Sequence, residues 1–117
     1  MTTVNAPSRG DVWLVTPDPT RGHEQSGRRP ALVVSADAFN RGPAGLVVVI
    51  PMTTKDKGIP LHVRIDPPEG GTKERCFIKC EDVRSISKER LVNRWGTISP
   101  KPMADVEDRL RILLGLF

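Results

Sequence analysis

Short stretches of apolar residues, either alternating with polar ones or continuous, recur along most of the chain. Alternation over residues 11–16 (DVWLVT) and 61–66 (LHVRID) predicts strands with one buried face. Residues 30–36 (PALVVSA) and 45–52 (GLVVVIPM) are apolar almost throughout, which predicts central strands. Further short stretches complete a set of about seven predicted strands: residues 75–80, 82–86 and 93–98.

The hydrophobic period changes near the C-terminus. Ser99 and Pro100 are typical of a helix N-cap and of the first helical position. Apolar residues then recur at gaps of three and four, which predicts a helix over residues 101–116 with one apolar face, interpreted as core or dimer contact. That face comprises Met103, Val106, Leu110, Leu113 and Phe117. The pattern predicts a single mainly β domain over residues 1–117, a small twisted antiparallel barrel with a C-terminal helix packed on it.

Length and composition restrict the class of protein. At 117 residues the chain is too short for two average domains, and 27% charged with 38% hydrophobic residues is typical of a globular protein. No run approaches the about 18 apolar residues that a membrane span needs. The N-terminus lacks the basic and apolar regions of a signal peptide. We therefore expect a cytoplasmic protein and no membrane partner.

The two cysteines do not predict a disulfide or a metal site. Cys76 and Cys80 lie on one predicted strand, about 13 Å apart, beyond disulfide reach. Neither His23 nor His62 has the spacing of a zinc ligand relative to them. We interpret both as small hydrophobic residues. No phosphate-binding loop, dinucleotide-binding glycine pattern or carboxylate cluster is present, so we predict no cofactor and no metal.

Positive charge is concentrated in one part of the sequence. The chain has 18 Lys and Arg against 14 Asp and Glu. Residues 73–101 contain eight cations and four acids, so this stretch carries a surplus equal to the whole net charge. Such a stretch suits a polyanionic partner, but a solvated face of mixed sign explains it equally well.

Two segments contain candidate chemistry. Residues 17–29 form a long polar loop, and its last residue, Arg29, precedes Pro30, which favours an extended backbone and a firmly held guanidinium. Hydroxyl groups and lysines directly follow the apolar strand at residues 45–52, where they can bind an anion. Taken alone, the first segment is equally a solvated loop and the second an ordinary turn.

Several motifs together resemble one family. Residues 9–13 (RGDVW), 18–35 (DPTRGHEQSGRRPALVVS) and 49–54 (VIPMTT) resemble the MazF/PemK toxins of type II toxin–antitoxin systems. The likeness continues through residues 58–60, 82–86 and the C-terminal helix. It implies an SH3-like barrel, a homodimer and a sequence-specific endoribonuclease that inhibits translation and growth. It also implies cleavage of single-stranded mRNA without metal, by 2′-OH attack that leaves a 2′,3′-cyclic phosphate and a 5′-OH end.

The resemblance also implies roles for residues. The family's functional Arg, Glu and Thr match Arg29, Glu24 and Thr53, which would neutralise phosphate charge, accept the 2′-OH proton and hold a phosphate oxygen. His23 or water would protonate the leaving oxygen, because an ordinary Arg is too weak an acid. We expect further RNA-binding residues around this set: Arg21, His23, Gln25, Arg28, Thr54, Lys55, Lys57, Lys79 and Arg84.

Two other functions fit the same fold. A non-enzymatic toxin that binds and poisons DNA gyrase would not need Arg29 and Thr53 together. A passive RNA-binding barrel would favour exposed aromatic residues, and the chain has only two Trp and three Phe. For the endoribonuclease, we expect a cognate antitoxin whose acidic, disordered tail occupies the RNA groove.

Overall fold

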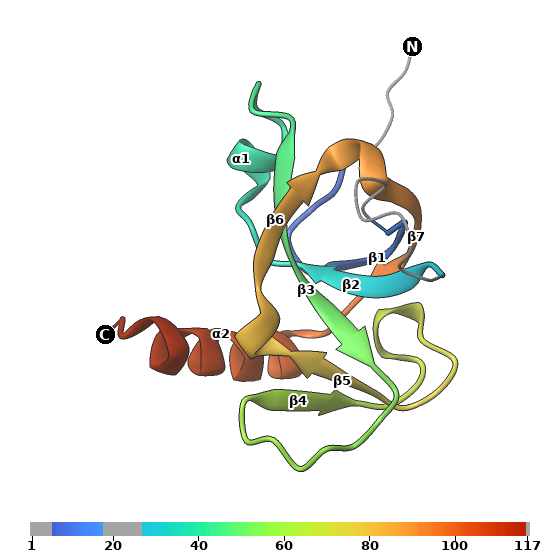
Figure 1. The fold of residues 1–117 in the computed structure, drawn as a ribbon, viewed down its shortest axis with the longest axis vertical. Coiled ribbons are helices and arrows are strands. Elements are labelled where there is room, and N and C mark those ends of the chain that lie inside the picture. The colour runs from blue at the N-terminus through green and yellow to red at the C-terminus, as the bar shows by residue number, and fades with distance from the viewer. Residues whose placement is uncertain (1–5, 18–26, 117) are drawn as a thin grey trace.

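The structure, a computed structural model, describes residues 6–17 and 27–116. These residues form seven strands and two α-helices, arranged as in Figure 1. The strands are β1 (Asp11–Val15), β2 (Arg29–Val33), β3 (Leu46–Thr53), β4 (His62–Ile65), β5 (Cys76–Lys79), β6 (Arg84–Ser87) and β7 (Leu91–Thr97). The helices are α1 (Asp37–Asn40) and α2 (Pro100–Leu114). Short 3₁₀ turns occupy Glu69–Gly71, Cys80–Asp82 and Lys88–Arg90.

The long strand β3 joins two parts of one antiparallel sheet. The sheet runs in the order β4-β5-β3-β2-β1-β7, and β6 pairs with the first half of β3. Met52 and Thr53, at the end of β3, pair instead with β5. The sheet therefore curls into a small barrel, although the order of the described strands stays open from β4 to β7. This confirms the predicted barrel with a C-terminal helix.

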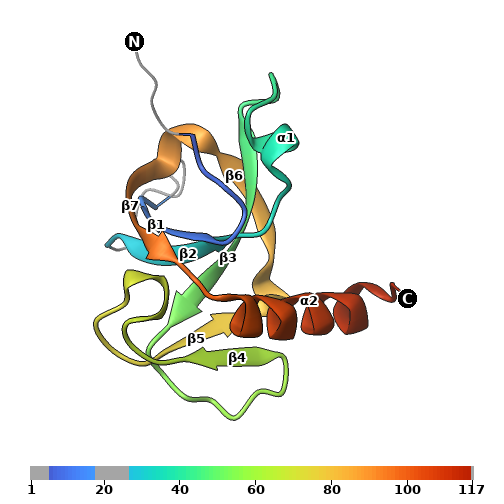
Figure 2. The ribbon, with the colours of Figure 1, turned by 180° about the vertical axis from the view of Figure 1, so that it is seen from behind.

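Strands β1, β2 and β3 are apolar on both faces because each face packs against a different layer. Alternate residues point to opposite sides of a strand. One face packs toward α2, β4 and β5, and Figure 2 shows α2 running across this side; its buried residues include Val12, Leu32, Ile50, Ile78 and Val106. The other face packs under β6 and β7, with Trp13, Ala31, Val33, Val49, Ile86 and Leu91.

Helix α2 forms where the sequence predicts it, but it begins one residue earlier, at Pro100, ends two residues earlier, at Leu114, and differs at its N-cap. The Ser99 hydroxyl makes no capping bond to the helix; it donates to Glu69 Oε2 at 2.6 Å, and the Ser99 amide donates to Oε1 at 2.8 Å. Gly115 ends the helix with a left-handed φ of 70°, a conformation that glycine adopts without strain. Within the described residues, neither helix combines the length and apolar character that crossing a membrane requires.

Candidate active site

The register of β2 and β3 brings two predicted catalytic residues together. Ala31 pairs with Pro51, and Leu32 pairs with Ile50. Continued by two residues, the same register sets Arg29 opposite Thr53, and both residues lie within their strands. Residues directly opposite each other share a face of the sheet. The β2–β3 pairing ends at Ala31 and Pro51, so the first residue of β2 and the last residue of β3 lie two residues beyond it, on the same face of neighbouring strands.

This pair belongs to a longer row that crosses five strands. Arg29 pairs with Val15 on β1, Thr53 pairs with Phe77 on β5, and Phe77 pairs with Arg64 on β4. We call Val15, Arg29, Thr53, Phe77 and Arg64 the transverse row. It begins at Val15, which packs against the inner core, and ends at Arg64, which is exposed. Since neighbouring strands lie about 4.8 Å apart, the sheet fixes the spacing of these residues.

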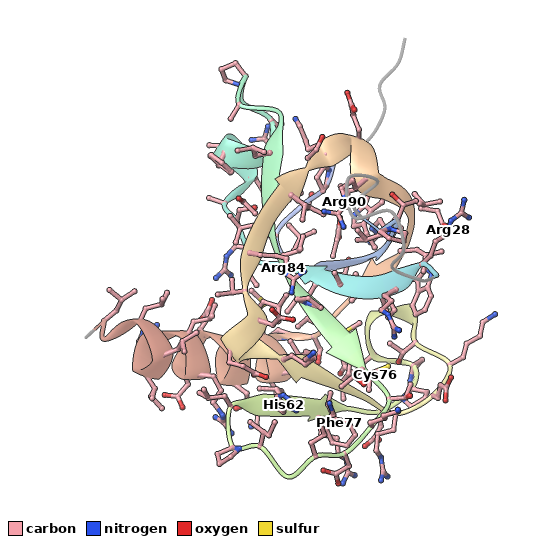
Figure 3. The ribbon with its side chains drawn as sticks, in the orientation of Figure 1. Arg28, His62, Cys76, Phe77, Arg84 and Arg90 are labelled. Atoms are coloured by element: carbon pink, nitrogen blue, oxygen red, sulfur yellow. The ribbon has the colours of Figure 1, made fainter. Side chains whose placement is uncertain are left out.

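The backbone after β3 leaves the Thr53 hydroxyl ready to donate. The Lys55 amide donates to Thr53 Oγ1 at 3.2 Å, in a turn at the strand end. Because the oxygen accepts this bond, the hydroxyl proton can point to another acceptor. Thr54, Lys55 and Lys57 are exposed in the following turn. Arg28 is also exposed, directly before β2, and its side chain points away from the sheet (Figure 3).

Four of the predicted site residues lie outside the described residues: Arg21, His23, Glu24 and Gln25. The described residues on either side of them, Pro17 and Gly27, adjoin the end of the β1–β2 hairpin where Val15 pairs with Arg29. The roles assigned to these four residues stay predictions.

Lys79 and Arg84 lie near the turn that joins β5 to β6, and both contact Asp82. Lys79 Nζ is 3.6 Å from Asp82 Oδ2, and Arg84 Nη2 contacts Oδ1 of the same carboxylate. Arg84 is exposed on the side of the molecule seen in Figure 3.

Other cations of residues 73–101 are distributed over different elements. Arg94 on β7 contacts Asp11, and Lys101 on α2 contacts Asp105. Arg90 donates to the Thr16 carbonyl. The cations that are close together in the sequence therefore belong to several elements and contact different groups among the described residues.

A buried histidine lies beside the turn that joins β5 to β6, and the sequence predicted no partner for it. The His62 side chain is 3% exposed, and its Nε2 is 2.9 Å from Glu81 Oε2. Its Nδ1 is buried and has no hydrogen-bond partner among the described residues. His62 pairs with Lys79 across β4 and β5, on the face that carries Arg64 and Phe77. Figure 3 labels His62 and Phe77 on these two strands. The contact with His62 therefore holds the side chain of Glu81, the residue that precedes Asp82 in the turn.

Both cysteines are free and buried, as the interpretation of small hydrophobic residues requires. Burial raises the pKa of the Cys76 thiol, and it raises the pKa of Cys80 to about 11. Neither thiol is therefore a nucleophile near neutral pH. The part of the chain that the structure describes contains no group of three or more His, Cys, Asp or Glu residues arranged to hold a metal ion.

Comparison with known proteins places this arrangement in a family. Residues 8–114 match the model of the PemK-like, MazF-like toxins of type II toxin–antitoxin systems. Endoribonuclease MazF9 of Mycobacterium tuberculosis is 35% identical, over 93% of this chain and 97% of that protein. Endoribonuclease EndoA of Bacillus subtilis is 35% identical, over 92% and 94% of the two chains.

Solved structures agree with the sequence comparison. A MazE–MazF structure from Deinococcus radiodurans superposes with a TM-score of 0.82 at 32% identity, covering 96% of this chain and 98% of that one. An endoribonuclease in complex with its cognate antitoxin, from a mycobacterial species, gives a TM-score of 0.77 at 27% identity, covering 97% and 98%. The chain therefore belongs to the PemK-like, MazF-like toxins of type II toxin–antitoxin systems, a family whose curated members similar to it are endoribonucleases.

Proposed function

We propose that this chain is a sequence-specific endoribonuclease that cleaves single-stranded mRNA without a metal ion or other cofactor. The observation that carries the proposal is the register of β2 and β3, which places Arg29 and Thr53 on one face at adjoining ends of these neighbouring strands. An arginine and a hydroxyl on the same face of neighbouring strands suit one phosphate group. Similarity to curated endoribonucleases over more than nine-tenths of the chain supports RNA as the substrate.

The substrate supplies the nucleophile in this reaction. The ribose 2′-OH attacks the adjacent phosphorus, the bond to the 5′-oxygen breaks, and the products are a 2′,3′-cyclic phosphate and a 5′-OH end. The protein aligns the attack and stabilises the charge that develops on the phosphoryl oxygens. Arg29 donates two parallel hydrogen bonds to the phosphate, and Thr53 donates its hydroxyl proton to a non-bridging oxygen.

Two protons move during the reaction, and neither Arg29 nor Thr53 acts as the proton acceptor or the proton donor. The pKa of an ordinary arginine is above about 12, so Arg29 is a poor proton donor. We assign the removal of the 2′-OH proton to Glu24, and protonation of the leaving oxygen to His23 or water. The remaining predicted contacts hold the flanking nucleotides: Arg21, Gln25, Arg28, Thr54, Lys55, Lys57, Lys79 and Arg84.

The test is incubation of the purified protein with a long single-stranded RNA in excess EDTA. We expect site-specific cleavage with 5′-OH ends, identified by end labelling. Arg29→Ala should lower kcat by about 10²–10³, as does removal of one charge-stabilising donor elsewhere. Arg41→Ala, at an exposed position after α1, is the matched control. Binding without cleavage in EDTA, or near-normal activity of Arg29→Ala, would contradict the mechanism.

We also propose that the active form is a homodimer. The last turn of α2 and the residues after it expose large apolar side chains: Ile112 is 66% exposed, and Leu114 and Leu116 are each 56% exposed. Apolar patches of this kind usually mark interfaces. Sedimentation equilibrium should give twice the 12.9 kDa chain mass, and the double variant Leu114→Glu/Leu116→Glu should give the monomer. A wild-type monomer at micromolar concentration would refute the dimer.

The inhibitor that we propose is an antitoxin with an acidic, disordered tail. Similar toxins have been solved with their antitoxins bound, which supports a partner of this kind. Expression of the toxin alone should stop translation and growth in the cytoplasm, and co-expression of the antitoxin should restore them. The tail places carboxylates where RNA places phosphates, so tail peptide and non-cleavable RNA should displace each other. Simultaneous, independent binding would exclude a shared groove.

A further inference from the structure

Two half-exposed arginines flank one aspartate at the exposed end of the transverse row. Arg64 donates to Asp66 Oδ2 from Nε at 3.2 Å and from Nη2 at 3.0 Å. Arg75 donates from Nε to Asp66 Oδ1 at 2.7 Å. One carboxylate therefore holds two guanidinium groups in fixed positions. We call Arg64 and Arg75 the arginine pair.

Backbone register places the arginine pair on the same face as Thr53. Arg64 pairs with Phe77, which pairs with Thr53, so Arg64 and Thr53 are two strands apart, at about 10 Å. The β4–β5 register continued by one residue sets Asp66 opposite Arg75. Phe77 lies between the two positions; it is only 7% exposed and carries no charge.

The contacts within the arginine pair leave donors for a ligand. Arg75 uses only Nε for Asp66, and Arg64 leaves Nη1 outside the bonds formed among the described residues. The side chains of Arg64 and Arg75 are 55% and 56% exposed. Exposed ion pairs of this kind add little to stability. The fold therefore gains little from holding two arginines here.

Net charge distinguishes this cluster from its neighbour on the same face. The arginine pair and Asp66 sum to +1. At the β5–β6 turn, the charges of Lys79 and Arg84 are balanced by those of Glu81 and Asp82, so these four side chains sum to zero. Among these two clusters, the excess positive charge lies at the Arg64 end of the transverse row.

We propose that the arginine pair is a second phosphate-binding site, which holds an RNA backbone phosphate adjacent to the scissile one. The inference rests on the proposed ribonuclease function and extends the RNA path from Arg29 and Thr53 across β5 to β4. Arginine guanidinium groups bind phosphate oxygens through paired hydrogen bonds, and phosphate contacts set the position of the strand without reading its sequence. The arginine pair therefore positions the RNA, and it leaves the cleavage motif unchanged.

The first experiment measures binding of a non-cleavable RNA, with 2′-deoxyribose at the mapped cleavage position, over a range of salt concentrations. We expect Arg64→Gln/Arg75→Gln to weaken binding about tenfold at low salt and to lower the salt slope by about 0.7, the value for one lost single-strand phosphate contact. With cleavable RNA, KM should rise and kcat should stay within twofold. The matched control is Arg41→Gln/Lys101→Gln, which removes two exposed cations from α2 and the end of α1.

The second experiment locates the phosphate. Neutral methylphosphonate linkages are introduced singly along the non-cleavable RNA. At one linkage beside the cleavage position, wild-type affinity should fall, and the Arg64→Gln/Arg75→Gln variant should show no further loss. If the Tm of the double variant is well below that of the wild type, the measurement is repeated with Arg64→Gln and with Arg75→Gln alone, because each removes only one exposed side chain.

The outcomes separate this inference from the proposed function. If the wild type binds RNA but never cleaves it, the ribonuclease function fails, and the methylphosphonate result still tests the arginine pair. If the wild type cleaves, and the variant matches the control in KM and salt slope, the second phosphate site is refuted. The inference also fails if the variant loses affinity only for an acidic peptide such as poly-glutamate, because the surface then binds protein.

Discussion

The RGDVW motif contains a buried carboxylate that joins β1 to β7, and its removal should destabilise the barrel. Asp11 is 4% exposed and accepts four hydrogen bonds. Oδ2 accepts from the Ser8 amide at 2.9 Å and from Trp13 Nε1 at 3.3 Å. Oδ1 accepts from Arg94 Nε at 3.2 Å and from Thr97 Oγ1 at 3.0 Å. The motif is therefore structural.

The cost of Asp11→Ala follows from what each donor loses. The Ser8 and Trp13 donors are buried or partly buried, and each costs about 1–3 kcal/mol when left unpaired. Arg94 is 51% exposed and returns to water at a cost below about 1 kcal/mol. We expect a total of about 3 kcal/mol, a large part of the about 5–15 kcal/mol that stabilises a domain. The Tm should fall by about 10–15 °C.

Two further variants test the reasoning. Asp11→Asn keeps an oxygen that can accept from the Ser8 amide and Trp13 Nε1, and it disturbs only the contact with Arg94. It should therefore lower the free energy of unfolding by about 1 kcal/mol, as Arg94→Ala should. Urea unfolding of all three variants measures the differences. An Asp11→Ala variant within 0.5 kcal/mol of wild type, an estimate of ordinary surface effects, would refute this account. So would an Arg94→Ala variant that is equally unstable.

Three other results are expected. A Cβ on Gly71 would lie 2.2 Å from the Trp95 carbonyl oxygen, so Gly71→Ala should cost more than about 3 kcal/mol by urea unfolding. A Cβ on Gly27 meets no atom of the described residues within 4 Å, so Gly27→Ala should be neutral. Burial raises the pKa of Cys80 to about 11, so iodoacetamide at pH 8 should modify this thiol only in denaturant. The unfolded chain loses the thiol proton at a lower pH than the folded protein does, so the stability contributed by Cys80 should fall as pH rises above about 8.5. Hydrogen bonds from Arg75 and Arg64 lower the pKa of Asp66, so NMR titration should give a midpoint below that of an ordinary aspartate. The midpoint should rise when both arginines are replaced by Gln. Any stability from this pair is lost as pH falls through the midpoint of the folded protein.

The sequence predicted the strands better than their ends. Alternation over residues 11–16 and the apolar run at 45–52 depend on local burial, and both strands form there. Residues 82–86 were predicted as strand, but the strand starts at Arg84, because Cys80–Asp82 form a turn where the chain leaves β5 for β6. Helix α1 was missed because four residues cannot show a helical period.

The site could be predicted residue by residue, but its spatial grouping could not. The family resemblance identified Arg29 and Thr53, which are 24 positions apart, whereas their pairing follows from the register of β2 and β3. The His62–Glu81 contact and the arginine pair depend on the β4–β5 register in the same way. A single sequence contains no direct signal for such register, since shifting a strand by one residue reverses its faces.

The transverse row explains how a small barrel can hold charged groups at fixed distances. Its Val15 end packs in the core and its Arg64 end is exposed, so core packing sets the register that spaces the residues between them. Groups on strands are held more precisely than groups on loops. In the proposed mechanism the strands therefore hold phosphates, while Glu24, and His23 or water, move protons; both residues lie between β1 and β2 in the sequence. A chimera that exchanges residues 18–26, apart from Arg21, with those of a relative should then change the cleavage rate or the cleavage motif. It should keep the salt slope, because Arg21, Arg29 and the arginine pair all remain. A chimera with a changed salt slope and the wild-type cleavage rate and motif would contradict this division.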